Sequence, residues 1–360
     1  MAERVILHIG SMKSGTSFVQ NVLGNNRAVL AEHGISLAGQ KWRDQVKAVQ
    51  DVIGQGGEGQ PPLRRNGPWR RLVKEIDAWQ GTAVVSMEFL APRNAAKIEL
   101  IRDSFDAPVD VVLTGRDLAR NLTAMWLESV QNGSATTWAH YLEAVRAEDR
   151  GNADGRAFWR HQGLASIAGR WSDAVGPEHF TLVTVPQKGA PADLLWTRFA
   201  SLLGIDPATC SLGVRANPSI GLATALVLRE LNEELAKGDP AAEEGTNPQR
   251  YHDLLVKHLL TKRALAHRHA QEPRLGLDAR WVLKRGTEEV RRLREAGHRV
   301  VGDLDELVPR PVPGVQPSDV SLQERHAAAM EALTRMVQIS ARREDRNRRR
   351  LAEAKEAAQR

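Results

Sequence analysis

The chain has 360 residues, of which 42% are hydrophobic and 26% are charged, a composition typical of a globular protein with a sizeable core. No apolar run reaches the ~18–20 residues that a membrane span needs, and the N-terminus, with an acidic Glu3, lacks the pattern of a signal peptide. Cys210 is the sole cysteine, which excludes an intramolecular disulfide and a cysteine metal site. We therefore expect a cytoplasmic protein.

The positive charge of the chain is concentrated at its end. The formal net charge is +6, and residues 341–360 hold eight Lys or Arg against four Asp or Glu, a difference of +4. Because the rest of the chain is nearly balanced, we expect no nucleic-acid partner. A local positive field around an anionic ligand is compatible with this balance.

The first predicted elements are a strand, a glycine turn and a helix. Residues 4–9 form a short β-branched run, Gly10 and Gly15 bracket a polar turn, and apolar residues such as Phe18 and Val22 then recur at helical spacing. Backbone N–H groups in such a turn and the partial positive charge of the helix N-terminus together form an anion site. We expect phosphate or a group of similar shape to bind there; the alternative is a glycine-rich turn without a ligand.

The turn is close to a Walker A loop but places its lysine differently. Gly10 and Gly15 have the G-x-x-x-x-G spacing, yet Thr16 stands where the P-loop lysine would be. The lysine comes two residues before the second glycine, at Lys13. Hydroxyl donors are added by Ser14, Thr16 and Ser17.

The following segments alternate between strands and helices. After a first helix that ends near Gly34, we predict strands at 35–37, 83–87, 109–114 and 180–185, and helices at 41–53, 69–79, 118–130 and 191–199. This alternation favours an α/β fold with a mostly parallel sheet flanked by helices, a three-layer sandwich like that of P-loop NTPases. The glycine-rich stretch at 54–62 is a lid, an acceptor gate or a solvated insertion.

From Asn217 onward we predict helices and no strands. The helices lie at 222–235, 251–267 and 278–296, and an irregular segment follows at 299–309. We accordingly divide the chain into an α/β core at 1–210, a helical completion of the same domain at 211–309, and a Pro-rich spacer with a helix and a charged tail at 310–360.

The last predicted helix begins with a capping box formed by Ser321 and Glu324. Its apolar stripe consists of Met330, Leu333 and Val337, as in a helix that docks on its own chain or mediates a homodimer. Beyond residue 340 the tail is charged and rich in alanine, and we expect it to fray.

Two charged residues lie just after predicted strands. Glu88 comes after the strand at 83–87, and Arg116 comes after the strand at 109–114. Open α/β sheets bind ligands at the carboxyl ends of their strands, and an arginine there holds phosphate through its planar fork of donors. The alternatives are a glutamate that merely begins a helix and an arginine in a surface ion pair.

These segments resemble bacterial sulfotransferases that use 3′-phosphoadenosine 5′-phosphosulfate (PAPS). Gly-Ser-Met-Lys-Ser-Gly-Thr-Ser at 10–17 matches the family's loop for the 5′-phosphosulfate, and the segment at 115–126 resembles its 3′-phosphate segment. The segments at 183–186, 194–199 and 302–309 are similar to one bacterial branch. The resemblance covers residues 4–309.

The resemblance implies transfer of a sulfuryl group from PAPS to a hydroxyl or amine, without a metal. Lys13 would stabilise the leaving phosphate and Arg116 would bind the 3′-phosphate. The family places a serine eight residues after this arginine, where the chain has Ala124; its neighbour Thr123 is the candidate contact. The 5′-phosphate would bind to Ser14, Gly15, Thr16 and Ser17.

An acceptor hydroxyl needs a general base, and Glu88 is the first candidate because other branches of the family use a glutamate. His161 is the second, although a lone histidine is more often structural. The acceptor is a small molecule, a lipid or a carbohydrate, and the segments at 136–162 and 55–60 are candidates for its pocket. The aromatic side chains that would stack on a ring there, or that form core, are Trp138, Tyr141, Phe158 and Trp159.

Two other functions compete with this hypothesis. A small-molecule kinase would need a lysine after Gly15 and an aspartate-based Mg²⁺ site, and neither is evident in the sequence. A catalytically decayed nucleotide-binding protein is favoured by Ala124.

Overall fold

The computed structural model describes residues 1–55, 61, 63–148, 152–213, 220–238, 256–257, 259–261, 264–265, 268 and 270–358, with only the backbone of 351–352 and 354–358. The chain divides into two compact units. The first consists of Met1–Leu122, Ala144–Ala216 and Asp278–Arg310, and the second of Thr123–Glu143, Asn217–Leu277 and Pro311–Arg360. Most of the glycine-rich stretch at 54–62 and of the predicted helix at 251–267 lies outside the described residues.

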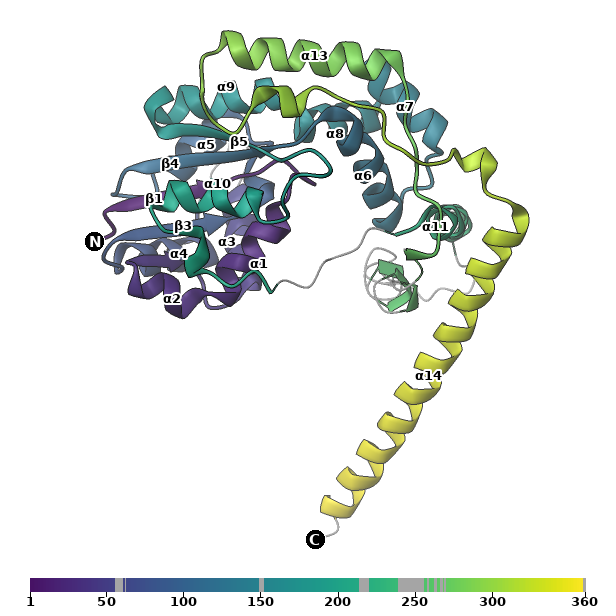
Figure 1. Cartoon of the computed structure of the whole chain (residues 1–360). Helices are drawn as coiled ribbons and strands as arrows, with labels where there is room; N and C mark the ends of the chain where they lie inside the picture. The colour runs from purple at the N-terminus through teal and green to yellow at the C-terminus, as the bar shows by residue number, and fades with distance from the viewer. Residues whose placement is uncertain are drawn as a thin grey trace. The chain divides into compact units, whose positions relative to one another are not determined.

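The first unit is built around a six-stranded, all-parallel sheet in the order β2-β3-β1-β4-β5-β6 (Figure 1). The strands are β1 (Arg4–His8), β2 (Ile35–Leu37), β3 (Thr82–Ser86), β4 (Val109–Gly115), β5 (Phe180–Thr184) and β6 (Arg299–Val301). The chain adds β2 and β3 on one side of β1 and then β4, β5 and β6 on the other, so the direction of winding changes at β1. In open α/β sheets, ligands bind outside the carboxyl ends of the strands at such a point.

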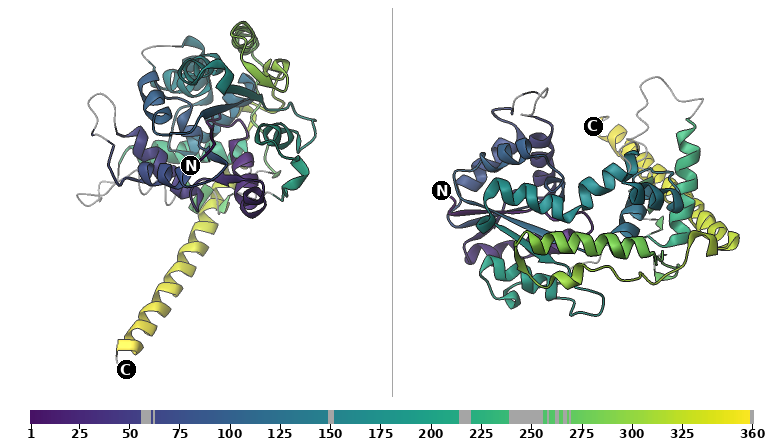
Figure 2. Two further views of the ribbon diagram at one scale, coloured as in Figure 1. Left: turned by 90° about the vertical axis from the view of Figure 1, so that its left-hand side faces the viewer. Right: turned by 90° about the horizontal axis from the view of Figure 1, so that it is seen from above.

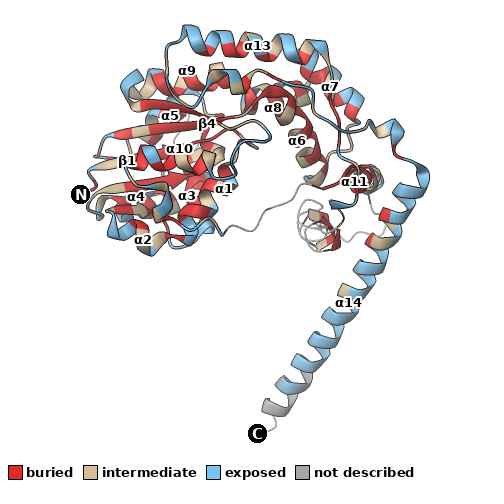
Figure 3. Cartoon of the chain, viewed as in Figure 1, coloured by how far each residue is buried: buried red, intermediate tan, exposed pale blue. Residues whose placement is uncertain are grey.

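The strands β1, β3, β4 and β5 are buried on both faces, which explains their nearly continuous apolar sequences (Figure 3). In β1, Val5 and Leu7 belong to one core cluster and Ile6 belongs to the other, because successive side chains point to opposite faces. The strand β1 pairs in parallel with β3 on one side and with β4 on the other, and Figure 2 shows the ribbon from two further sides. Burial on both faces requires a helical layer on each.

Helices form these two layers. The layer with Ile6 contains α1 (Thr16–Asn25), α2 (Arg27–Glu32) and α10 (Leu194–Leu203). The layer with Val5 and Leu7 contains α3 (Trp42–Ile53), α4 (Pro68–Asp77), α5 (Ala95–Arg102), α9 (Leu164–Val175) and α13 (Arg280–Glu295). The short helix η1 (Glu88–Leu90) follows β3, and α8 (Ala153–Gln162) precedes α9. The predicted α/β sandwich with a helical C-terminal part is confirmed.

The second unit contains the helices α11 (Leu222–Ala236) and α14 (Leu322–Ala358) and two isolated β-bridges, Leu275–Val315 and Leu277–Val312. Two helices cross the boundary in sequence: α6 (Leu118–Gln131) begins in the first unit, and α7 (Trp138–Ala147) begins in the second. The first turns of α14 pack against α11, with an Arg325–Glu230 ion pair at 3.0 Å. The capping box is present, since the Glu324 N–H donates to Ser321 Oγ at 3.2 Å and the Ser321 N–H donates to Glu324 Oε2 at 2.8 Å.

Two expectations for the C-terminal part are wrong. A strand, β6, does follow residue 217 and pairs in parallel with β5. It could not be predicted because a segment of three residues is too short to show a periodic pattern of apolar residues. The helix α14 continues to Ala358, because Ala, Glu, Lys and Arg are strong helix formers.

The face of α14 that docks is also not the predicted stripe. Small side chains are buried, at Ala328 and Ala332, whereas the side chains of the predicted stripe are 48–69% exposed: Met330, Leu333 and Val337. The stripe therefore does not dock on its own chain among the described residues, and its alternative role in a homodimer stays a prediction.

Candidate functional site

The loop that joins β1 to α1 is attached to β4 at its start. The Ile9 N–H donates to the Val112 carbonyl at 2.9 Å, and the Ser11 N–H donates to the Thr114 carbonyl at 3.0 Å. The loop therefore leaves the sheet at the carboxyl ends of two adjacent parallel strands.

Two positions of this loop require glycine. Gly10 and Gly15 have φ angles of 33° and 82°, in the region that L side chains rarely adopt. A Cβ at Gly10 would lie 2.5 Å from Thr16 Oγ1, and one at Gly15 would lie 2.4 Å from Leu195 Cδ2. The glycine spacing in the sequence thus reflects backbone geometry and close packing.

The hydroxyl groups of the loop divide into buried and exposed ones. Ser14 is fully buried; its Oγ donates to the Ser11 carbonyl at 2.6 Å, and its N–H donates to the same carbonyl at 3.2 Å. Thr16 is also buried, with Oγ1 3.4 Å from that carbonyl. Lys13 and Ser17 are exposed. The hydroxyls of Ser14 and Thr16 therefore shape the loop, and Lys13 and Ser17 present their side chains outward.

The N-terminus of α1 has no side-chain cap. Gly15 occupies the cap position in a left-handed conformation. Among the described groups, none accepts a hydrogen bond from the backbone N–H of Gly15, Thr16 or Ser17. Three adjacent donors at the positive end of a helix, beside an exposed lysine, form a site suited to a phosphate-like anion.

A chain of buried polar side chains lies beneath the loop. His8 is fully buried at the end of β1, with Nδ1 2.7 Å from Ser86 Oγ and Nε2 3.2 Å from Thr114 Oγ1. Thr114 Oγ1 in turn lies 2.8 Å from Ser14 Oγ. Burial lowers the pKa of His8 to about 3, so the ring is neutral at pH 7. This network connects the ends of β3, β1 and β4 to the loop.

Arg116 follows β4 and lies beside the loop. Its guanidinium NH1 donates to the Lys13 carbonyl at 3.2 Å. Burial, and then the neighbouring Arg120 guanidinium, lower the pKa of Arg116 to about 10, with Asp117 acting in the opposite direction. The side chain therefore remains a cation at pH 7. Arg120, by contrast, forms an ion pair with Asp117.

Glu88 is held at the same edge of the sheet by a side chain from α1. It is the first residue of η1 and is half-buried. Gln20 Nε2 donates to Glu88 Oε2 at 3.0 Å and to the Ser86 carbonyl at 2.9 Å. Because β3, β1 and β4 are parallel neighbours, Glu88, Lys13 and Arg116 all follow strand ends at one edge.

The end of α8 is also attached to the loop. Gln162 is buried, and its Nε2 donates to the Met12 carbonyl at 2.8 Å. Asn121 Nδ2 donates to Gln162 Oε1 at 2.7 Å and to the Arg116 carbonyl at 3.3 Å. The two amide side chains thus join the loop that carries Lys13 to the turn that carries Arg116.

His161, the second candidate base, is half-buried in the last turn of α8. Its Nδ1 is buried and has no hydrogen-bond partner among the described residues. Burial, then Arg160 and Arg93, lower the pKa of His161 to about 4. At pH 7 the ring is neutral, and its low basicity makes it a weaker proton acceptor than an ordinary histidine.

Thr123 is buried in α6, and Ala124 beside it is half-buried. Thr123 is the first residue of the second unit, whereas Arg116 and Lys13 belong to the first. Its role as a 3′-phosphate ligand stays a prediction.

The aromatic side chains named as candidates for the acceptor pocket are mostly core. Trp138 and Tyr141 are buried in the second unit, with ring centroids 6.1 Å apart. Phe158 is buried in the first unit. Trp159 is half-buried; its Nε1 donates to the Val145 carbonyl at 2.9 Å, and Arg285 lies 4.6 Å from its ring centroid.

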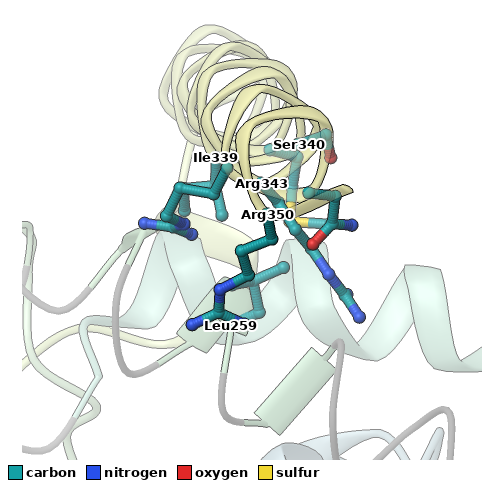
Figure 4. Close-up of a pocket in the computed structure, with 8 residues that line it drawn as sticks. Leu259, Ile339, Ser340, Arg343 and Arg350 are labelled. Atoms are coloured by element: carbon teal, nitrogen blue, oxygen red, sulfur yellow. The ribbon is translucent and has the colours of Figure 1, made fainter. Parts of the chain in front are cut away.

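A surface hollow occurs in the second unit beside α14 (Figure 4). Its lining residues are Leu259, Met336, Ile339, Ser340, Arg343, Arg346, Asn347 and Arg350. None of them is a predicted site residue. Within the described part of the chain, no three His, Cys, Asp or Glu side chains gather as a metal site would require. No helix of the described residues has the length and apolar character that crossing a membrane demands.

Sequence reasoning missed three polar residues that position the site. His8 is the most detectable, because it interrupts an otherwise apolar buried strand. Gln20 and Gln162 carry no such signal, since each lies on a helix where a polar residue is ordinary and only the tertiary contact shows its role.

No protein-family model and no curated protein matches the chain. A solved structure that is similar is a sulfotransferase from Alicyclobacillus acidocaldarius, with 15% sequence identity and a TM-score of 0.32, covering 65% of this chain and 96% of that chain. A similarity of this size supports no functional conclusion. We therefore base the function on the residues of the site itself.

Proposed function

We propose that the protein is a sulfotransferase that moves a sulfuryl group from PAPS to a hydroxyl or amine of an acceptor. The observation that carries the proposal is the contact between Arg116 NH1 and the Lys13 carbonyl, 3.2 Å apart. PAPS has phosphate at both its 5′ and 3′ positions and needs two cationic sites for one nucleotide. Two cationic turns at the same sheet edge meet that need.

The 5′ end of the nucleotide would bind at the loop. Its ligands would be the uncapped N–H groups of Gly15, Thr16 and Ser17, the Ser17 hydroxyl and the Lys13 ammonium. The buried hydroxyls of Ser14 and Thr16 would hold the loop in shape. These donors suit an oxyanion without a metal, since backbone dipoles and a lysine supply the positive charge.

The transfer is an in-line displacement at sulfur. As in phosphoryl transfer, the protein has to position the two reactants and to stabilise the negative charge that develops. Lys13 would stabilise the negative charge that develops on the oxygen that leaves sulfur. Glu88, oriented by Gln20, would accept the proton of the acceptor hydroxyl. Arg116 would hold the 3′-phosphate, with Thr123 as a further candidate ligand.

The experiment that tests the proposal is calorimetric titration with the desulfated product, 3′-phosphoadenosine 5′-phosphate (PAP), and separately with ATP and Mg²⁺. We expect nanomolar-to-micromolar affinity for PAP and much weaker binding of ATP. Preference for ATP would instead support a small-molecule kinase. Absence of nucleotide binding would overturn the proposal.

A further inference from the structure

The stretch of α14 at residues 341–350 carries a high density of arginine. All ten of these residues are exposed. Six of them are arginines, against one glutamate and one aspartate, a difference of +4. Among the described residues, a carboxylate lies within ion-pair distance of just one of the six, in the exposed Arg348–Glu344 pair at 3.1 Å. The stretch is therefore strongly basic, and most of its charge is uncompensated.

The surface hollow beside α14 joins three of these arginines. Arg343, Arg346 and Arg350 all line it and are spaced three and four residues apart, so they share one face of the helix, which we call the arginine face. The same hollow has three half-buried apolar side chains in its lining, Leu259, Met336 and Ile339 (Figure 4). A smaller hollow also contains Arg346 and adds two further arginines, Arg335 and Arg342. Guanidinium groups gathered in this way repel one another unless an anion lies among them.

A different face of α14 carries the exposed apolar stripe, which consists of Met330, Leu333 and Val337. At ~100° per residue, the stripe and the arginine face lie roughly 140° apart around the helix axis. The buried Ala328 and Ala332 share the side of the arginine face, so the stripe is turned away from the packed side of the helix. A helix with an exposed apolar stripe on one side and arginines on the other is typical of helices that lie at the surface of anionic membranes.

We propose that residues 330–350 of α14 bind the surface of an anionic lipid bilayer. The apolar stripe would enter the boundary between headgroups and acyl chains, and the long arginine side chains would reach the lipid phosphates. The basic stretch would be attracted to the negative surface potential of such a bilayer. This inference stands apart from the proposed sulfotransferase function, because it uses none of the predicted site residues.

Two other occupants fit the observations less well. Nucleic acid would supply phosphates, but it would leave the apolar stripe in water, and α14 has no Phe, Tyr or Trp on which bases could stack. A second copy of the chain would cover the stripe, but its own basic stretch would supply few anions for the arginine face. An anionic bilayer satisfies both faces at once.

The test is co-sedimentation of the full-length protein with lipid vesicles at physiological salt. One set of vesicles contains phosphatidylcholine alone, and the other contains phosphatidylcholine mixed with the anionic phosphatidylglycerol. We expect the protein to sediment with the anionic vesicles and to stay in the supernatant with the neutral ones. The lipid concentration at which half of the protein is bound measures the affinity.

Two variants separate the contributions of the two faces. The triple variant Arg343→Gln, Arg346→Gln and Arg350→Gln should raise the half-binding lipid concentration about a hundredfold, at about fivefold for each arginine near an anionic surface. The double variant Leu333→Gln and Val337→Gln should raise it about tenfold, because it removes apolar area that enters the bilayer. All five side chains are exposed, so both variants are expected to fold.

The matched control for the triple variant removes three exposed positive charges from the first unit, in Arg65→Gln, Arg70→Gln and Lys74→Gln. It has the same net charge as the triple variant but an intact α14. We expect the control to bind anionic vesicles as the wild type does.

Several results would overturn the inference. One is wild-type protein that binds neither set of vesicles, or both equally. Another is a triple variant that binds as tightly as its control, or a double variant that binds as tightly as wild type. Tighter binding to polyuridylate RNA than to anionic vesicles at the same salt would assign the arginine face to nucleic acid. A wild-type dimer in sedimentation velocity that the double variant dissociates would mean that a second copy covers the stripe.

Discussion

Acidification is expected to destabilise the fold through one buried side chain, His8. Its ring is fully buried against two hydroxyl groups, and burial lowers its pKa from 6.5 to about 3. Below pH 6.5 the unfolded chain binds a proton at this ring that the folded protein does not, so the free energy of unfolding falls. At about 1.4 kcal/mol per pH unit, His8 alone removes about 2 kcal/mol by about pH 5. Above pH 6.5 the ring is neutral in both the folded and the unfolded chain, so His8 no longer changes the free energy of unfolding with pH.

Urea denaturation at about pH 8 and about pH 5, with wild type and His8→Gln, measures this effect. The glutamine amide keeps a donor and an acceptor but does not titrate. The pKa values of His161 and His298 are also lowered by burial, and these groups titrate in both proteins and cancel in the difference. We expect wild type to lose about 2 kcal/mol more than the variant between the two pH values. Equal losses would refute the account of His8 as a buried neutral ring.

Three substitutions test the loop and the base. Lys13→Ala should lower kcat by ~10²-fold or more, because it removes charge from the leaving oxygen; initial rates of PAP release measure this, and an unchanged rate would exclude the assigned role. Glu88→Gln should lower kcat by a similar factor; if kcat stays at the wild-type value, the base lies elsewhere and His161 is tested next. Gly15→Ala places a Cβ at a φ of 82° and 2.4 Å from Leu195 Cδ2, so thermal unfolding should report a loss of ~1–2 kcal/mol or more. An unchanged Tm would mean that the loop relaxes.

The central sheet could be predicted from local sequence. The runs that form β1, β3 and β4 are apolar and β-branched because they are buried on both faces, and each ends at a glycine or a charged residue. The loop between β1 and α1 could also be predicted from local sequence. Gly10 and Gly15 mark it, because the backbone geometry at these two positions leaves no room for a side chain. Fold class and the position of the loop follow from these features.

Long-range contacts could not be predicted in the same way. The strand β6 consists of three residues and exists through its pairing with β5. The Gln20–Glu88 and Gln162–Met12 hydrogen bonds join residues 68 and 150 positions apart, and no local pattern marks them. The packed face of α14 could not be predicted either, because small alanine side chains, and not the larger apolar ones, form it.

The measurement that tests the central claim most directly compares PAP with adenosine 5′-phosphate, which lacks the 3′-phosphate, in wild type and Arg116→Gln. If Lys13 and Arg116 hold opposite ends of one nucleotide, wild type binds PAP at least about tenfold more tightly than adenosine 5′-phosphate, by one charge-assisted contact. The Arg116 substitution then removes most of this preference and leaves the affinity for adenosine 5′-phosphate nearly unchanged. Equal affinity of wild type for the two nucleotides, or a preference that survives the loss of Arg116, would contradict the account.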